Sequence, residues 1–231
     1  TAADELRVTS SLRDAADGAR VHVVSASTPI ATDADLDPLR DALATVADGL
    51  DAGDVVLVER ALPVGTSRDE LVPLLSTESG LDPDEFGFAF TPERPPTSGL
   101  AGLEDDHTRI VAGRDADSER VATTVLEVLT GADVTRVSDL ETAEYVGQIV
   151  GAYRAVTTAL TNEFARHAPD LGVDVTEIVA VANERSDCHL PAPNLGTASG
   201  RSDGVSTLLR DELGSDTRLL DAARVSNDLM P

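Results

Sequence analysis

The stretch SDLETAEYVGQIVGAYRAVTTALTNEFARHA, residues 138–168, predicts one long amphipathic helix. Ser138 and Glu141 have the spacing of a capping box, in which two backbone donors are satisfied at the helix start. Pro169 and Gly172 follow the stretch and predict its end. Such a helix is about 45 Å long, which is long for a globular domain. We expect it to join two domains or to pack against a second copy of itself.

Apolar side chains recur along this helix at steps of three and four residues, which places them in one stripe. We expect the stripe to form a dimer interface. Gly147 and Gly151 lie four residues apart, and we interpret them as allowing a second helix to come close. The predicted interface residues are Val146, Ile149, Val150, Tyr153, Val156 and Leu160.

Before the long helix, short β-branched runs alternate with helical patterns, which is typical of βαβ units and a parallel sheet. After it, only helical patterns follow, near residues 174–183 and 217–228. We therefore predict an α/β protein with a partial Rossmann-like parallel sheet at 1–137. The long central helix and a small all-helical dimerisation domain occupy 138–231. The predicted strands are residues 21–27, 55–58, 86–90, 109–111 and 134–137.

The chain is strongly acidic, with 42 acidic residues against 18 basic ones and a net charge of −24. All the basic residues are arginines, because the sequence contains no lysine. This balance argues against nucleic-acid or anionic-lipid partners, because both need phosphates to be neutralised by cations. The acids are spread along the whole length, so we interpret them as a surface adapted to high intracellular salt. The composition resembles that of halophilic archaeal proteins.

No run of 18 apolar residues and no signal-peptide pattern is present, so we expect neither a membrane span nor secretion. The single cysteine, Cys188, excludes an internal disulfide and fits a reducing cytoplasm. Cys188 has two interpretations, a displaced nucleophile or an inert thiol in a loop. His22 lies inside a strand run and is interpreted as a packed residue. The other histidines lack metal-ligand spacing, so no metal site is predicted.

Ligands of parallel sheets bind where the strands end. Three loops leave predicted strand ends, at Thr28-Pro29, at Pro63–Thr66 and at Pro92-Glu93-Arg94. Thr28 and Pro29 are candidate cofactor contacts, although they could also serve as a strand terminator. Glu93 is the candidate acid or base and Arg94 a candidate substrate contact, although the two could also form a solvated ion pair.

The order of these pieces resembles the UDP-glucose/GDP-mannose dehydrogenase family, whose members oxidise the C6 alcohol of a nucleotide sugar to a carboxylate with NAD. The resemblance covers nearly the whole chain and about half of a full-length enzyme. It implies that the long helix is the family's central dimerisation helix. The matching stretches are TPI at 28–30, VVLVE with PVGT within 55–66, TPER at 91–94, TRIVAG at 108–113, AEYVGQIVGAYRAVTTALTNEFA at 143–165 and ARVSND at 223–228.

The chain also departs from this family. No GxGxxG turn is present, and the family's nucleophilic cysteine position matches Arg201. The family's lysine on the long helix has no counterpart, because the chain contains no lysine. We therefore expect a truncated and degenerate member that does not bind NAD alone and acts as an inactive subunit, in a homodimer or in a heterodimer with an active paralogue. Two alternatives stay open, namely an active dehydrogenase whose missing domains lie outside this chain and a non-catalytic nucleotide-sugar binding module.

Overall fold

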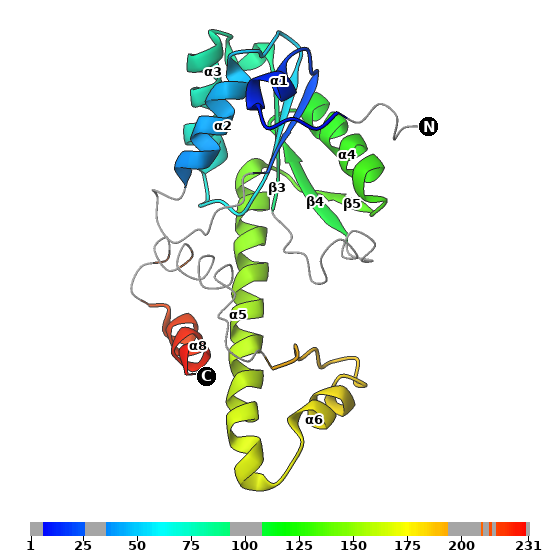
Figure 1. Ribbon diagram of the computed structural model, residues 1–231, viewed down its shortest axis with the longest axis vertical. Helices are drawn as coiled ribbons and strands as arrows, with labels where there is room; N and C mark the ends of the chain where they lie inside the picture. Colours follow the sequence, from blue (N-terminus) through cyan, green and yellow to red (C-terminus); the bar gives the residue numbers. More distant parts are fainter. Residues whose placement is uncertain are drawn as a thin grey trace. The chain divides into compact units, whose positions relative to one another are not determined.

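A five-stranded sheet forms the core of the first part of the chain (Figure 1). The computed structural model describes residues 7–25, 36–92, 108–193 and 216–229, together with Leu209 and Leu213. The α/β class is confirmed, and the five strand predictions are confirmed within a few residues at each end. The strands, in spatial as well as sequence order, are β1 (Val21–Val24), β2 (Val55–Glu59), β3 (Gly87–Thr91), β4 (Arg109–Gly113) and β5 (Val134–Arg136).

The sheet is mostly parallel, but one pair of strands differs from the prediction. β1, β2 and β3 are parallel, as are β4 and β5, whereas β3 and β4 are antiparallel. Ala89 on β3 faces Gly113 on β4 in this pair. The predicted parallel sheet is therefore confirmed for three of its strand pairs, and the β3–β4 pair departs from it. A parallel pair requires the chain to return to the edge where the first strand began, whereas β4 starts at the edge where β3 ends.

Helices cover both faces of the sheet, as Figure 1 shows. One face packs against α2 (Asp37–Ala47) and α3 (Val72–Ser79). The buried cluster on this side joins Phe88 and Phe90 of β3 to the helix residues Leu39, Leu43 and Leu75. The other face packs against α4 (Ala116–Thr130) through Leu57, Ala89, Val111, Ala122 and Leu126. Side chains alternate between the two faces along each strand, so strands buried on both faces read as continuous apolar runs. The helices of this part are α1 (Leu12–Ala16), α2 (Asp37–Ala47), the π-helix η3 (Ser67–Leu71), α3 (Val72–Ser79), the 3-10 turn η4 (Pro83–Glu85) and α4 (Ala116–Thr130).

The long helix exists as predicted, but both of its ends differ. Helix α5 spans Leu140–Leu171, which is 32 residues. The cap is Asp139 rather than Ser138, because Oδ1 of Asp139 accepts the backbone N–H of Thr142 at 2.7 Å. The predicted Ser138–Glu141 capping box is therefore wrong. Pro169 lies inside the helix, which ends at Gly172 with φ +67°.

Helix α5 buries small side chains and exposes larger apolar ones. Apart from Leu140 in the first turn, its buried apolar residues are alanines, among them Ala152, Ala155 and Ala159, whereas Tyr153 is 56% exposed. Helix α8 (Arg218–Asp228) packs on this alanine face, because Nδ2 of Asn227 donates to the carbonyl of Ala155 at 3.2 Å. Alanine permits such close backbone approach because its side chain is short. The apolar stripe predicted from the sequence is therefore not the face that packs within the chain.

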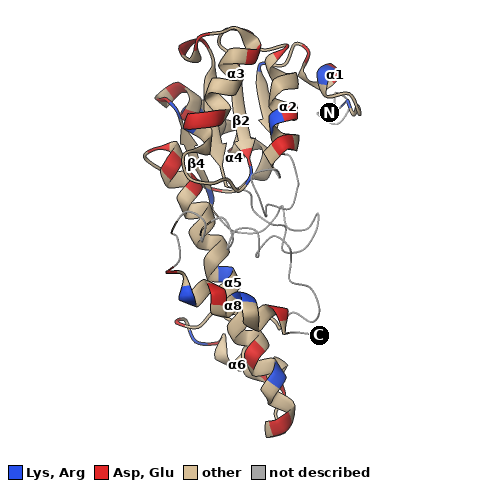
Figure 2. Cartoon of the chain, turned by 90° about the vertical axis from the view of Figure 1, so that its left-hand side faces the viewer, with Lys and Arg blue, Asp and Glu red and all other residues tan. Residues whose placement is uncertain are grey.

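The chain divides into two compact units, and the boundary falls inside α5, between Val146 and Gly147. The second unit also contains α6 (Val175–Ala182) and α8. The predicted domain limits at 137 and 138 remain a prediction. Figure 2 shows acidic residues and scattered arginines along the helices and loops of each unit. Within the described ranges, no helix combines the length and the apolar character that crossing a bilayer requires.

Candidate functional site

An ion pair spans the sheet at the edge where β2 and β3 end. Nη1 of Arg109, the first residue of β4, lies 2.5 Å from Oε1 of Glu59, the last residue of β2. Both side chains are mostly buried, at 13% and 22% exposure. They lie two residues from Val111 and Leu57, which face α4, and the two-residue period places them on the same face. The pair therefore crosses the carboxyl end of β3 on the α4 side.

Thr91 and Arg60 are buried beside this ion pair. Thr91 ends β3 and pairs with Glu59 in register, and its side chain is fully buried. Its hydroxyl forms no hydrogen bond with the described residues. Arg60 follows β2, is also fully buried, and its backbone N–H donates to the carbonyl of Thr91 at 3.2 Å. Sequence reasoning missed Arg60, although an arginine directly after a buried apolar strand is the signal that could have identified it.

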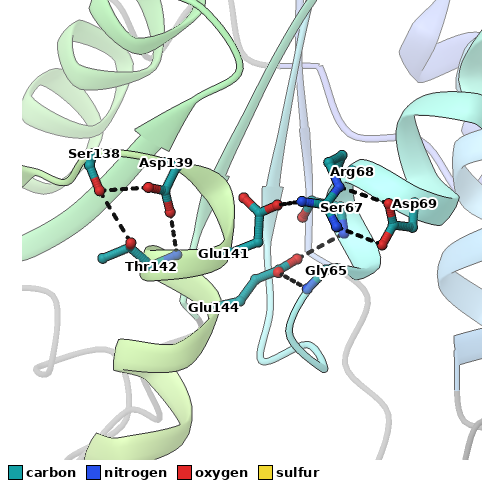
Figure 3. A network of polar contacts seen from close by, with 9 residues as sticks. All are labelled: Gly65, Ser67, Arg68, Asp69, Ser138, Asp139, Glu141, Thr142 and Glu144. Atoms are coloured by element: carbon teal, nitrogen blue, oxygen red, sulfur yellow. Dashed lines mark hydrogen bonds and ion pairs between the residues drawn. The ribbon is translucent and has the colours of Figure 1, made fainter.

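A second polar cluster joins the loop after β2 to the first turns of α5 (Figure 3). The carboxylate of Glu144 accepts the backbone N–H of Gly65 at 2.6 Å and that of Ser67 at 2.8 Å. Glu144 is only 1% exposed. Burial raises the pKa of this carboxyl, and the hydrogen bonds from Ser67 and Gly65 offset part of that rise. The sequence analysis did not identify Glu144 as a site residue.

Exposed charges surround this buried carboxylate (Figure 3). Arg68 forms ion pairs with Asp69, at 2.8 Å, and with Glu141 on α5. The hydrogen bond from Arg68 lowers the pKa of Asp69. Exposed pairs of this kind contribute little to stability. The buried carboxylate is therefore the distinctive element of the cluster.

Only some of the residues singled out from the sequence lie in the part of the chain that the structure describes. Four predicted site residues and the Arg201 position lie outside the described residues, so their roles remain predictions; the four are Thr28, Pro29, Glu93 and Arg94. His22 is buried on β1, which confirms its interpretation as a packed residue. Cys188 is a half-buried free thiol. Within the described ranges, no three His, Cys, Asp or Glu side chains form a group that could hold a metal ion.

The predicted interface residues all lie on α5. Four of them are exposed by 43% to 56% of their surface, namely Ile149, Val150, Tyr153 and Leu160. Val146 and Val156 are half-buried. The exposed face is thus apolar, which is compatible with an interface, and the dimer itself remains a prediction.

The carboxyl end of β2 does not fit a dinucleotide phosphate. A phosphate in an α/β fold binds to free backbone N–H groups at a helix start. The N–H groups of Gly65 and Ser67, at the start of η3, are already bonded to Glu144. An anion at this loop would have to displace a buried carboxylate of the same chain.

Comparison with known proteins adds a sequence match over the first part of the chain. Residues 1–129 match the profile described as "UDP-glucose/GDP-mannose dehydrogenase family, NAD binding domain". A UDP-N-acetyl-D-mannosamine dehydrogenase of Pyrococcus horikoshii is 29% identical over 229 residues, covering 98% of this chain and 54% of the relative. The corresponding enzyme of Methanocaldococcus jannaschii is 28% identical, covering 85% of this chain and 44% of its own length. The chain thus spans about half the length of these relatives.

Solved structures show the same fold. The structure of UDP-D-ManNAc dehydrogenase from Pyrococcus horikoshii superposes with a TM-score of 0.82 at 27% identity, covering 98% of this chain and 54% of that one. A UDP-glucose dehydrogenase from Pyrobaculum islandicum superposes with a TM-score of 0.79 at 20% identity, with the same coverage. The second likeness concerns the fold alone. The match extends over α5 and the helices after it, because it covers nearly the whole chain.

Proposed function

The chain belongs to the UDP-glucose/GDP-mannose dehydrogenase family, and on that basis we propose that it is a non-catalytic subunit that forms a dimer through α5. The family consists of NAD-dependent nucleotide-sugar dehydrogenases. At the β2 loop the described residues do not fit a dinucleotide phosphate, because Glu144 already accepts the N–H groups of Gly65 and Ser67. The observation that carries the proposal is the exposed apolar face of α5.

Charge depletion along α5 supports an interface. Residues 145–162 contain one charged residue, Arg154, although 26% of the whole chain is charged. Interface cores are depleted in charge and enriched in aromatic residues, and Tyr153 lies near the middle of this stretch with 56% of its surface exposed. A solvated helix of such an acidic protein would carry more charges. The stretch is therefore better suited to contact with another protein surface.

A second copy of the same chain is the occupant we propose. Two copies of one helix related by a two-fold axis present identical faces to each other, so an apolar face on one is matched by the other. The chain carries a net charge of −24, which would repel a second copy. The 145–162 stretch has no acidic residue, so the repulsion is smallest where the two helices would meet.

The sequence supports the proposal that this chain does not catalyse the family's reaction. The family resemblance requires a cysteine that captures the aldehyde, and Arg201 stands at the matching position. Cys188 lies thirteen residues before it. Without the nucleophile the covalent path through a thioester is lost, and removal of such a group lowers turnover by several powers of ten. The chain also has no lysine to stabilise developing negative charge.

Matched surface variants test the dimer. Tyr153→Glu introduces a charge into the proposed interface, whereas Val128→Glu introduces the same charge at a residue of α4 that is 78% exposed. In molar KCl, sedimentation should show a monomer for Tyr153→Glu and a dimer for Val128→Glu. Equal association of both variants and the native chain would contradict an interface on this face.

An activity assay tests the non-catalytic role separately. NAD reduction is measured in molar KCl with UDP-glucose, UDP-N-acetylmannosamine and GDP-mannose. We expect no turnover above the background without protein. Turnover that Glu93→Gln abolishes would contradict the proposal and favour an active dehydrogenase.

A further inference from the structure

The buried carboxylate of Glu144 connects two of the stretches that resemble the family, the start of the long helix and the PVGT loop. Glu144 lies in the first turns of α5, and its two partners lie 79 and 77 residues earlier in the chain. Gly65 belongs to the PVGT loop, and Ser67 begins η3. All three residues belong to the same compact unit. The contact therefore ties the start of the long helix to the carboxyl end of β2 (Figure 3).

Glu144 is held by backbone N–H groups rather than by a cation. The neighbouring Arg68 bonds to Asp69 and Glu141, and within the described residues no arginine contacts Glu144. Helices η3 and α3 follow one another without interruption from Ser67 to Ser79. Their N-terminus carries partial positive charge, which favours an anion at that end. The dipole and the two N–H donors thus replace a counter-ion.

The loop that receives the carboxylate has an unusual backbone. Gly65 has φ +89°, a conformation that other residues adopt only with strain. A Cβ at this position would also lie 3.1 Å from Oδ2 of Asp69. Because glycine adopts negative φ as readily as positive φ, Gly65 alone does not fix the direction in which the N–H groups of this loop point. The buried carboxylate of Glu144 accepts both N–H groups at once, so it stabilises the one loop conformation in which both point toward it.

We propose that Glu144 is a positioning residue whose carboxylate, by accepting two hydrogen bonds at once, holds the Gly65–Ser67 loop, with Gly65 in its left-handed conformation, against the first turns of α5. This role goes beyond the subunit function and holds whether or not the chain dimerises. This positioning role requires a side chain with two acceptor oxygens, and a side chain of the same shape with only one acceptor oxygen cannot perform it. Glutamine keeps the shape but offers one oxygen and one N–H₂ group.

Several ionisable groups lie close enough to influence a titration of Glu144. Glu141 lies on the same helix and raises the pKa of Glu144 by repulsion, although burial is the larger cause. Arg68 and Asp69 lie on η3, and Arg68 is paired with both acids around it. The backbone N–H of Ser67 acts in the opposite direction, because its hydrogen bond to Glu144 favours the carboxylate and so lowers this pKa.

Amide hydrogen exchange, measured residue by residue by NMR in molar KCl, tests the proposal. In Glu144→Gln, one of the Gly65 and Ser67 amides should exchange about tenfold faster or more, because one acceptor is lost. In Glu144→Ala both should do so. Glu141→Gln is the matched control, since it removes a carboxylate three residues away on the same helix and leaves both amides bonded to Glu144. Unchanged protection of both amides in Glu144→Ala would overturn the proposal.

A titration of the native chain keeps the test decisive if a Glu144 variant does not fold. The amide signals of Gly65 and Ser67 should shift together with one midpoint above the usual glutamate pKa of about 4.3. The same titration should persist in Glu141→Gln. Signals that do not titrate, or that titrate with two separate midpoints, would show that no shared carboxylate holds the loop.

Discussion

Arg109 on β4 reaches over the carboxyl end of β3 to Glu59 on β2, with Nη1 and Oε1 2.5 Å apart. The pair thereby links two strands that are not neighbours in the sheet. Because both side chains are mostly buried, salt screens this pair less than it screens surface pairs. Arg109→Met should lower the free energy of unfolding by about 2 kcal/mol in molar KCl, since it leaves a poorly solvated carboxylate unpaired.

A double-mutant cycle in denaturant unfolding measures this pair. Glu59→Gln with Arg109→Met should cost less than the sum of the single changes, because the partner charge is then absent too. Arg120→Met is the control, since Arg120 pairs with Asp117 on the exposed surface of α4. Its expected cost is near zero. Strict additivity in the Glu59–Arg109 cycle would show that the two charges do not interact.

Gly113 at the end of β4 should not tolerate a side chain. A Cβ there would lie 2.3 Å from the backbone nitrogen of Glu119 and 2.7 Å from the carbonyl of Asp115. Gly113→Ala should therefore destabilise the chain by about 3 kcal/mol. Gly49→Ala, where the nearest atom is 4.0 Å away, should change stability little. Thermal unfolding of both variants provides the comparison, and equal melting temperatures would contradict it.

His22 should make the fold less stable in mild acid. Burial lowers the pKa of this imidazole, although Asp54 opposes the effect. The unfolded chain therefore takes up the proton at a higher pH than the folded chain, and stability is lost as pH falls through about 6.5. His22→Gln should lose less stability than the native chain between about pH 7 and 5. His189→Gln, at an exposed position, should behave like the native chain; identical pH profiles for all three would contradict this.

High salt should stabilise the fold. The net charge of −24 disfavours the compact state through self-repulsion, and molar KCl screens that repulsion to within a few ångströms. The melting temperature should rise by about 5 °C or more between low-salt buffer and molar KCl. Sucrose at matched osmolality, which does not screen charge, is the control. A melting temperature that ignores KCl, or that sucrose raises equally, would contradict the salt-adaptation hypothesis.

The elements of this fold were predictable because local signals agree with the tertiary structure. The run at Val55–Val58 is buried on both faces, so its apolar pattern predicts a strand directly. The long helix has a sustained 3.6-residue pattern and a terminal glycine. The sequence predicts its cap one residue early, because Ser138 and Asp139 both carry oxygen acceptors and only the structure shows that Asp139 is the cap.

The long-range features could not be predicted from local pattern. The antiparallel pairing of β3 and β4 depends on where the chain re-enters the sheet, which no residue of either strand encodes. Glu144 resembles any helical glutamate in sequence, and its partners lie 77 and 79 residues away. The apolar stripe of α5 was predicted correctly as a stripe, but the chain packs its alanine face instead. Within the chain, α5 is packed through its face of short alanine side chains, because these allow the backbones of two helices to approach closely, and the face with larger apolar side chains stays exposed.

The mass of the native chain in molar KCl, measured by light scattering over a range of concentrations, tests the proposed subunit role most directly. The account predicts twice the 24.1 kDa of one chain, and a fall to a single chain in Tyr153→Glu. A native mass of 24.1 kDa at every concentration would leave the apolar face of α5 without a second copy and contradict the account.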